Sequence, residues 1–508
     1  MNLRALLQPA AGLFLLFWLL ILLILRTQAF DDPGALWHVR VGDQIFEHGF
    51  PHTDPFTWAY ADHPWIPQQW GAECMLSLAH RVGGFDTMLL LMATLLAAFA
   101  AWVGKRFIES GLHWSMAAAL VAIGMAAAAF HFYLRPHLAT IVLMGVVMGL
   151  LVDFERRKVG IGRWLWLVPL CVVWTNLHGG VLGGVVTLGM AVAGWALLWV
   201  LGKESPIRSV RNVLALGAII VACALTTLVN PFGLEMLRTW WSIIGSTELP
   251  KYISEHQPLN PSATDGQAIV GFAVFYILML AGTFPQRPRV TWLLPLVWFA
   301  LTCKSIRHGP LFCTTALVAL ADFFPHTAWF RLLKKHGDTL VRDPLPELER
   351  SGWSSWVVPT LAVFGALALQ VGRVPVPVVG YGWVVLSPKG HPVGLIEPLR
   401  EYASSKSTGY PIFNDPNLGG FLIYFTPELR VFMDDRCELY GDAGIRDYVD
   451  LAQDHPERID EWLKRAPAPI ERLLVAPDSP MERWLKQEAS RFHEVARCRQ
   501  AVLFEVVR

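Results

Sequence analysis

The sequence predicts a polytopic α-helical membrane protein that carries a small α/β domain at its C-terminal end. The first observation is composition: of 508 residues, 54% are hydrophobic and only 16% are charged, whereas about a quarter of the residues in a soluble domain are charged. The second is a series of apolar runs of membrane-span length, which ends near residue 372. The third is the pattern that follows, in which short apolar strands alternate with helices.

A membrane span needs about 20 consecutive, mostly apolar residues. About eleven runs approach this length: 8–26, 86–104, 115–132, 137–153, 161–177, 180–201, 212–230, 267–285, 290–303, 309–324 and 353–372. The first run and the RTQA that follows it also match a signal peptide with its cleavage site. We favour an anchor, because this run is long for a signal peptide and many spans follow it.

The loops between these runs alternate in lysine and arginine content, which predicts the orientation. With a cytoplasmic N-terminus, the inner loops hold Lys105, Arg106, Arg156, Arg157, Lys158, Arg163, Lys203, Arg208, Arg211, Arg287, Arg289, Arg331, Lys334, Lys335, Arg342 and Arg350. The short outer loops hold only Arg135, Lys304 and Arg307. With an odd number of spans, the C-terminal domain then lies outside the plasma (inner) membrane.

Three parts follow from these patterns. Residues 1–372 form the transmembrane domain, in which 27–85 is a long first extracytoplasmic loop with interfacial helices. Residues 373–390 are a linker rich in proline and glycine, and residues 391–508 form the extracytoplasmic α/β domain. In that domain we expect strands at 411–413, 430–433, 472–476 and 501–507, and helices at 447–453, 457–465 and 481–489.

Net charge and cysteines restrict the partners. The formal net charge is +1, so no basic surface for nucleic acid is indicated, and membrane lipids are the expected surroundings. The seven cysteines show no metal-type spacing. Cys437 and Cys498 could form a disulfide outside the cytoplasm or remain two buried thiols, and the sequence leaves both alternatives open.

The stretch DDPGALWHVRVGDQIFEHG (31–49) opens the first loop. Its apolar residues recur at helical spacing, which predicts an amphipathic helix in the membrane interface. Pro33 suits the first helical position, and Asp32 suits the N-cap before it. Capping accounts for Asp32, whereas Asp31 has no such structural duty and is the better candidate for chemistry.

Ionisable residues are almost absent from the middle of the spans, which argues against a transporter. The polar residues collect instead at the outer ends: His38, Arg40, His52, Asp54, Gln68, Gln69 and Glu73, then Arg135, His137, Asn176, His178, Asn230, Glu255, His256, Arg307 and His308. Each one alone is most simply a snorkelling or capping group. Together they predict one outward-facing polar cavity.

Two motifs stand out in the C-terminal part, NDPNLGGF and FMDDRCELYG. The pair Gly419–Gly420 could bring backbone close to a ligand, but it lacks the GxGxxG pattern of nucleotide binding. Asp434 and Asp435 follow a predicted strand and could bind an acceptor or an ion. Acids in this position are more often turn residues, and we favour the turn.

With these features the chain resembles the GT-C superfamily of membrane glycosyltransferases, which includes oligosaccharyltransferases, family 39 protein O-mannosyltransferases and lipid A aminoarabinose transferases. The shared features are an inside N-terminus, acids just after the first span, about eleven to thirteen spans and an outer C-terminal domain. The stretches DDPGALWHVRVGDQIFEHGFPHTDPFTW and PIFNDPNLGGFLIYFTPELRVFMDDRCELYG are similar to segments of bacterial GT-C-like proteins. No residue pattern names a sugar.

The resemblance implies transfer of a sugar from a polyprenyl-phosphate donor to a lipid, glycan or protein acceptor. Such a reaction needs a carboxylate for the acceptor and cations for the departing phosphate. Asp31 is then the expected base and Asp32 the weaker candidate, because family 39 relatives commonly have Asp-Glu here and proline follows Asp32 directly. The expected phosphate ligands are Arg135, Arg307, His178 and His308. The expected cavity-lining residues are His38, Arg40, His137, Asn176 and Asn230.

A divalent cation is an open question. Oligosaccharyltransferases place a metal-binding acid in the long loop before the eighth span, where this chain has Glu255 and His256. By that resemblance the two residues would bind Mg²⁺ or Mn²⁺. Relatives of the protein O-mannosyltransferases do not all need a metal, so metal-free catalysis is the other alternative.

A second hypothesis is a non-catalytic GT-C-like envelope protein that binds or scaffolds a partner through its C-terminal domain. The enzyme hypothesis predicts that Asp31→Asn abolishes transfer at normal protein abundance. The scaffold hypothesis predicts that Asp31→Asn, Arg135→Ala and Arg307→Ala are tolerated. It also predicts that damage to the surface formed by 410–441 is not.

Overall fold

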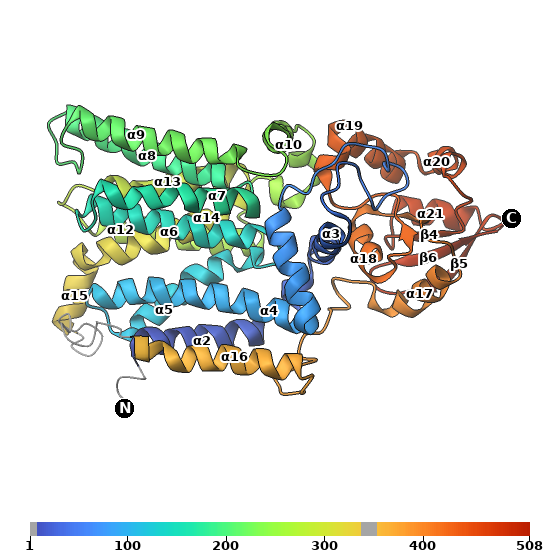
Figure 1. Cartoon of the computed structure of the whole chain (residues 1–508), viewed down its shortest axis with the longest axis horizontal. Helices are drawn as coiled ribbons and strands as arrows, with labels where there is room; N and C mark the ends of the chain where they lie inside the picture. The colour runs from blue at the N-terminus through green and yellow to red at the C-terminus, as the bar shows by residue number, and fades with distance from the viewer. Residues whose placement is uncertain (1–7, 337–352, 508) are drawn as a thin grey trace.

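The structure, a computed structural model, describes residues 8–336 and 353–507. Roughly aligned helices form an elongated body, and the C-terminal domain lies at one end of it (Figure 1). The start of α2 (Pro9–Ile24) and α15 (Ala328–His336) lie at the opposite end. The fold class predicted from the sequence, a polytopic helical membrane protein with a small C-terminal α/β domain, is confirmed.

Each predicted span coincides with an apolar helix. These are α2 (Pro9–Ile24), α4 (Trp70–Glu109), α5 (Trp114–Ala128), α6 (His137–Glu155), α7 (Leu167–Leu177), α8 (Val181–Val200), α9 (Val210–Leu225), α12 (Thr264–Ala281), α13 (Val290–Lys304), α14 (Gly309–Phe323) and α16 (Val357–Val371). In the described ranges, seven helices are long and apolar enough to cross a membrane, or eight if the bent pair over 306–336 is one span. The helical segments Pro9–Ile24, Ile161–Leu177 and Val290–Lys304 are shorter.

Helix α4 contains both the helical end of the first loop and the predicted span at 86–104, which were expected to be separate elements. It bends at Gly83 and Gly84, which have non-helical backbone angles, with φ of +71° at Gly84. Glycine tolerates a positive φ that other residues avoid. The part before the bend belongs to the first loop, and the part after it corresponds to the predicted span at 86–104.

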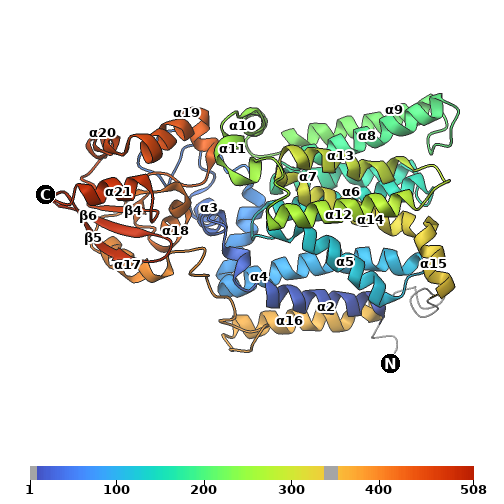
Figure 2. The same ribbon diagram turned by 180° about the vertical axis from the view of Figure 1, so that it is seen from behind.

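Helix α3 (Gly34–His48) differs from expectation, because it does not lie open on a membrane surface. It lies between the helical body and the C-terminal domain (Figures 1 and 2). Ala35 and Val39 belong to the buried core of the body. Leu36 and Val41 belong to the buried core of the C-terminal domain. The helix is therefore covered on two sides. Its apolar pattern alone does not show whether one side or two sides are covered.

The C-terminal domain is built on a four-stranded sheet in the order β2 (Phe413–Asn414), β4 (Arg472–Val475), β6 (Val502–Val506), β5 (Phe492–Arg497). The pair β2–β4 is parallel, whereas β4–β6 and β6–β5 are antiparallel. A separate short parallel pair joins β1 (Tyr410–Pro411) to β3 (Leu429–Arg430). The helices are α17 (Ile396–Ser404), α18 (Pro416–Phe425), α19 (Cys437–Val449), α20 (Ile459–Arg465) and α21 (Pro480–Gln487).

The predicted strands at 472–476 and 501–507 correspond to β4 and β6, and the predicted helices at 457–465 and 481–489 to α20 and α21. Strand β5 was not predicted, because most of its side chains are exposed and no apolar run marks it. Helices α17 and α18 were also not predicted. In the expected strand at 430–433, only Arg430 pairs within the domain, and Val431 pairs with Thr57 of the first loop.

The first loop is therefore bonded to the C-terminal domain. The Trp58 N–H donates to the Val431 carbonyl oxygen at 3.0 Å, and the Val431 N–H donates to the Phe56 carbonyl oxygen at 3.0 Å. The Trp58 indole also donates to the Ile412 carbonyl oxygen at 3.0 Å. Helices α10 (Leu234–Gly245) and α11 (Leu249–Tyr252) from the body lie at the same boundary (Figure 2).

Residues 373–390 contain no helix or strand and run along the body. Asp86 accepts hydrogen bonds from the N–H groups of Gly382 and Val384, both at 2.7 Å. The Arg26 guanidinium lies 4.1 Å from the centre of the Trp383 indole ring. All seven cysteines are free thiols in this structure, as in the disulfide-free alternative.

Candidate active site at the domain boundary

Asp32 and Arg135 form an ion pair at the boundary between the body and the C-terminal domain. The Arg135 Nη1 atom lies 3.1 Å from Asp32 Oδ2. The other oxygen, Oδ1, accepts a 2.8 Å hydrogen bond from the Gly34 N–H at the start of α3. The prediction that Asp32 is the N-cap is wrong, because the helix begins at Gly34 and its N-cap is Pro33, without a side-chain cap. The hydrogen bond to Gly34 uses one oxygen of Asp32, and the second one orients Arg135.

Arg135 also faces Glu255, whose Oε2 lies 3.6 Å from Arg135 Nη1. The next residue, His256, receives a 2.6 Å hydrogen bond at Nε2 from the Nη1 of Arg307. Glu255 and His256 form the short helical turn η5 (Ser254–His256). This turn therefore holds Arg135 on one side and Arg307 on the other.

The contacts with Arg135 and Arg307 affect the protonation states of Glu255 and His256 in this turn. Burial alone would raise the pKa of Glu255, but Arg135 and Arg307 outweigh it and the pKa is lowered, so Glu255 stays ionised. Burial and the nearby Arg307 lower the pKa of His256 to about 4, so its ring is neutral near pH 7. Two arginines, one carboxylate and one neutral imidazole meet here.

His178 contributes a hydrogen-bond donor to the same region. Its Nδ1 accepts from the Gly180 N–H at 3.0 Å and lies 2.9 Å from Thr140 Oγ1. Because Trp174 Nε1 donates to Thr140 Oγ1 at 2.8 Å, we infer that the threonine hydroxyl donates to the ring and that the ring proton is on Nε2. Burial, with His137, Arg307 and Arg135 nearby, lowers the pKa of His178. The ring therefore offers a neutral N–H donor.

Asp435 reaches this cluster from the C-terminal domain. Its Oδ1 accepts a 2.7 Å hydrogen bond from the Trp37 indole of α3. A methyl group placed on Gly34 would lie 2.9 Å from Asp32 Oδ1, 3.1 Å from Asp435 Oδ2 and 3.2 Å from Arg135 Nε. Three charged side chains thus converge on the space that glycine leaves open.

Burial raises the pKa of Asp435 to about 7, and the negative charges of Asp32 and Asp434 add to this effect, while Arg135 opposes it. The adjacent Asp434 has a different role. It binds the buried Arg436 through both oxygens, with Nη2 to Oδ2 at 2.6 Å. The two neighbouring acids therefore have different partners. Asp434 is paired within the domain, whereas Asp435 faces the boundary.

Asp31 lies apart from the Arg135 cluster. A methyl group placed on Gly390 would lie 2.6 Å from Asp31 Oδ1, so this carboxyl group packs against the end of the linker. Asp31 Oδ1 is buried and has no hydrogen-bond partner among the described residues. Burial raises the pKa of Asp31, while His391 and Lys389 oppose it.

His38 forms a buried pair with Glu73. Its Nδ1 lies 3.0 Å from Glu73 Oε1, and neither side chain is more than 2% exposed. Burial lowers the pKa of His38. Arg40, on the same helix, donates to the Tyr424 carbonyl oxygen at 2.8 Å. Both residues hold α3 in place between the body and the C-terminal domain.

The other expected cavity residues also bind backbone. Asn176 donates to the carbonyl oxygens of Val172 and Val229 at 2.8 and 2.9 Å. Asn230 accepts from the Phe232 N–H at 2.8 Å within its own turn. The ring of His137 contacts the His131 carbonyl oxygen at 2.6 Å. The remaining phosphate candidate, His308, packs beside Trp298, with ring centres 5.8 Å apart.

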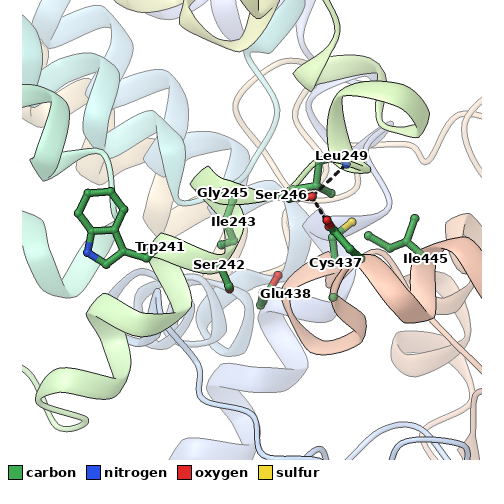
Figure 3. Close-up of a pocket in the computed structure, with 11 residues that line it drawn as sticks. Trp241, Ser242, Ile243, Gly245, Ser246, Leu249, Cys437, Glu438 and Ile445 are labelled. Atoms are coloured by element: carbon green, nitrogen blue, oxygen red, sulfur yellow. Dashed lines mark hydrogen bonds between the residues drawn. The ribbon is translucent and has the colours of Figure 1, made fainter.

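A pocket of about 370 Å³ lies beside the cluster, between α10–α11 and α19. Ser242, Ile243 and Gly245 line it from the body, and Glu438 and Ile445 line it from the C-terminal domain (Figure 3). Its two acids, Glu438 and Asp442, are not matched by any lysine or arginine in the lining. The pocket therefore disfavours anionic groups, in contrast to the arginine cluster next to it.

Glu255 and His256 do not fit a divalent cation in this arrangement. Both residues contact positively charged guanidinium groups, Glu255 that of Arg135 and His256 that of Arg307. His256 Nε2, one of the two ring nitrogens that can bind a metal, already accepts a hydrogen bond from Arg307. In the part of the chain that the structure describes, no three His, Cys, Asp or Glu side chains are placed to hold a metal.

Fold and site together define a polytopic membrane protein with a charged site enclosed between its helical body and an α/β domain. No protein-family model matches the chain, and no curated protein matches it in sequence. Among solved structures, it is similar to ArnT from Cupriavidus metallidurans, crystallised with bound undecaprenyl phosphate. The identity is 15%, the match covers 97% of this chain and 98% of that chain, and the TM-score is 0.47. At this identity and TM-score the similarity supports no conclusion about function.

Gly34 was not singled out from the sequence. Asp435 was named as able to bind an acceptor or an ion, but the turn was favoured. The signal for Asp435 was present, because two acids follow a strand and only one has a local partner. Nothing in the sequence signalled Gly34, since its importance depends on side chains that arrive from two distant loops.

Proposed function

We propose that this chain is an integral membrane glycosyltransferase that transfers a sugar from a polyprenyl-phosphate donor to an acceptor. The reaction would occur at the outer face of the plasma membrane, with the N-terminus in the cytoplasm. One observation carries the proposal: Arg135 and Arg307 both contact the turn Glu255–His256, and Arg135 also pairs with Asp32 close to Asp435 of the C-terminal domain.

The two guanidinium groups keep donors available for a phosphate. An arginine has five N–H donors, and each of these two binds its partners within the cluster through Nη1. Among the described residues, no partner is found for Nη2 of either side chain. His178 adds its Nε2–H. Donors from three separate loops favour a multi-oxygen anion such as phosphate over a single carboxylate.

The charge change of the reaction matches this arrangement. A sugar linked to polyprenyl phosphate is a phosphodiester with one negative charge, and its departure leaves a phosphomonoester with up to two. Fixed cations that meet this additional charge lower the barrier. Asp32 and Glu255 hold Arg135 in place, which keeps the guanidinium oriented before the donor arrives.

Binding of undecaprenyl phosphate to the purified full-length protein in detergent tests the first step. Arg135→Ala and Arg307→Ala each remove a charge-assisted contact of about 1.5–3 kcal/mol, so affinity should fall roughly 10- to 100-fold. Arg81→Ala is the matched control, because Arg81 is 43% exposed and pairs with Asp43. Equal affinity in all four proteins would contradict the proposal and favour the scaffold hypothesis.

Transfer is tested with synthetic undecaprenyl-phosphate sugars and a bacterial membrane extract as the source of acceptor. Release of undecaprenyl phosphate should depend on the wild-type protein and on the extract. The two arginine variants should release much less, whereas the Arg81→Ala protein should match the wild type. Activity that persists in both Arg135→Ala and Arg307→Ala would place the phosphate site elsewhere.

A further inference from the structure

We propose that Asp435, from the C-terminal domain, is the base that takes the proton of the acceptor hydroxyl or amine. The inference rests on the proposed glycosyl transfer and adds the identity of the proton acceptor. It places this catalytic residue in the α/β domain instead of the first loop. Glu255 is a poor candidate, because Arg135 and Arg307 lower its pKa. Three other carboxylates near the cluster are candidates, and their surroundings differ.

Asp31 is poorly placed for this role. Its Oδ1 faces the backbone of Gly390, with a hypothetical methyl group there only 2.6 Å away. This oxygen is buried and unpartnered among the described residues, so an acceptor would have to displace the linker to reach it. Among the described residues, no hydrogen bond or ion pair joins Asp31 to either arginine of the phosphate site.

Asp32 lies in the cluster, but both of its oxygens are occupied. Oδ1 accepts from the Gly34 N–H at 2.8 Å, and Oδ2 pairs with Arg135 at 3.1 Å. Asp32 is better suited to hold Arg135 than to accept a proton.

Asp435 combines a fixed position with an available oxygen. The Trp37 indole holds Oδ1 at 2.7 Å, and no described residue donates to Oδ2. Oδ2 faces the open space at Gly34, on which Asp32 and Arg135 also converge. A proton taken here is therefore removed within the same small volume in which Arg135 meets the phosphate.

The surroundings of Asp435 also suit a base that works near neutral pH. Its pKa is raised to about 7 by burial and by Asp32 and Asp434, against the effect of Arg135. The thiol of Cys437, which follows on the same segment, stays neutral because burial and nearby acids raise its pKa. A base is most effective when its pKa lies near the working pH.

The step balances as follows. The acceptor O–H or N–H bond breaks, and its proton goes to Asp435 Oδ2. The freed electron pair forms a bond to the anomeric carbon of the sugar. The bond from that carbon to the phosphate oxygen breaks, and its electron pair stays on the phosphate between Arg135 and Arg307. The acidic pocket beside α19 fits an acceptor that is neutral or cationic at this point.

The test compares Asp435→Asn with Asp447→Asn in the full-length protein. Asparagine keeps the acceptor for the Trp37 hydrogen bond but cannot take a proton. We expect transfer by Asp435→Asn to fall about 10²- to 10⁴-fold, the usual contribution of a general base. Asp447 belongs to the same domain, is 38% exposed and pairs with Arg458, so Asp447→Asn should match the wild type.

Two further readouts separate a catalytic role from a structural one. Wild-type transfer should decline as the pH falls below about 7, because protonated Asp435 cannot accept a proton, and the residual activity of Asp435→Asn should lack this decline. Affinity for undecaprenyl phosphate should stay within about twofold of the wild type, since the arginines are retained. Asp435→Asn should leave the free energy of unfolding unchanged, because burial already disfavours the ionised form of Asp435.

The outcomes are distinguishable. Wild-type rate and pH profile in Asp435→Asn, with transfer intact, overturn this inference and leave the proposed function standing. Loss of transfer in Asp31→Asn but not in Asp435→Asn would return the role to the first loop. If the wild type releases no undecaprenyl phosphate from any donor, the proposed function is rejected, and this inference with it.

Discussion

Asp54 of the first loop and Arg436 of the C-terminal domain form an ion pair that is closed to solvent. Asp54 Oδ1 lies 2.7 Å from Arg436 Nη2, and both side chains are 0% exposed. The guanidinium also binds Asp434 and lies 4.6 Å from the centre of the Trp65 ring. The Arg436 guanidinium thus joins the two parts of the molecule, because it binds one carboxylate from each.

This pair predicts a loss of stability when it is broken. Arg436→Ala should lower the free energy of unfolding by about 3–5 kcal/mol, because the buried carboxylates of Asp54 and Asp434 lose their cation. Thermal unfolding in detergent measures the effect. Arg465→Ala is the control, because Arg465 is 63% exposed and pairs only at the surface. A melting temperature of Arg436→Ala equal to that of this control would contradict the prediction.

Gly420 predicts a second effect at the same boundary. A methyl group on Gly420 would lie 2.3 Å from the Pro33 carbonyl oxygen, and backbone cannot move aside as a side chain can. Gly420→Ala should therefore destabilise the packing of α18 on α3 by about 1–3 kcal/mol. Limited proteolysis of the C-terminal domain should become faster. Gly217→Ala, where nothing lies within 4 Å, should leave the proteolysis rate unchanged, and equal rates in both variants would disprove the effect.

The donors around Glu255 predict that transfer is independent of metal ions. His256 Nε2 is already bonded to Arg307, and Glu255 faces Arg135, so arginines supply the positive charge. Incubation with EDTA followed by desalting should leave the rate of undecaprenyl phosphate release unchanged. Loss of activity that returns with Mg²⁺ or Mn²⁺ would show that the loop rearranges to bind a metal, as the resemblance to oligosaccharyltransferases implies.

Gly34 predicts a catalytic defect without loss of the fold. A side-chain carbon there would lie 2.9 to 3.2 Å from atoms of Asp32, Asp435 and Arg135, so each must shift. Displacements of this kind at reacting groups cost up to about 10²-fold in rate. Gly34→Ala should slow transfer strongly while its melting temperature remains close to that of the wild type. An unchanged rate would mean that the space at Gly34 is not used.

The helical body could be predicted from the sequence because its signal is local. A run of about 20 apolar residues marks a span without reference to any other segment, and each predicted run coincides with an apolar helix. Strand β5 lacked such a signal, since its exposed charged side chains resemble a loop. The burial of α3 on two sides could not be predicted, because its second cover comes from a distant part of the chain.

The candidate site likewise contains residues that the sequence indicated and residues that it did not. The sequence indicated that Arg135, Glu255, His256 and Arg307 lie at one end of the body, and the structure brings them into contact. It favoured Asp31 over Asp32 because capping seemed to account for Asp32, whereas the structure pairs Asp32 with Arg135, 103 residues away. It named Asp435 only as a possible ligand of an acceptor or an ion, since no local pattern shows which of the two acids faces the boundary.

The position of α3 has a consequence for how this chain can be assembled. Trp37 and Asp435, which share a hydrogen bond, are 398 positions apart, so α3 leaves the ribosome long before its partners. Leu36 and Val41 remain without their cover until the last part of the chain has been made and moved to the same side of the membrane. The α/β domain, expressed alone, would lack part of its own interior. The protein is in this sense one cooperative unit whose interior is completed only by its final segment.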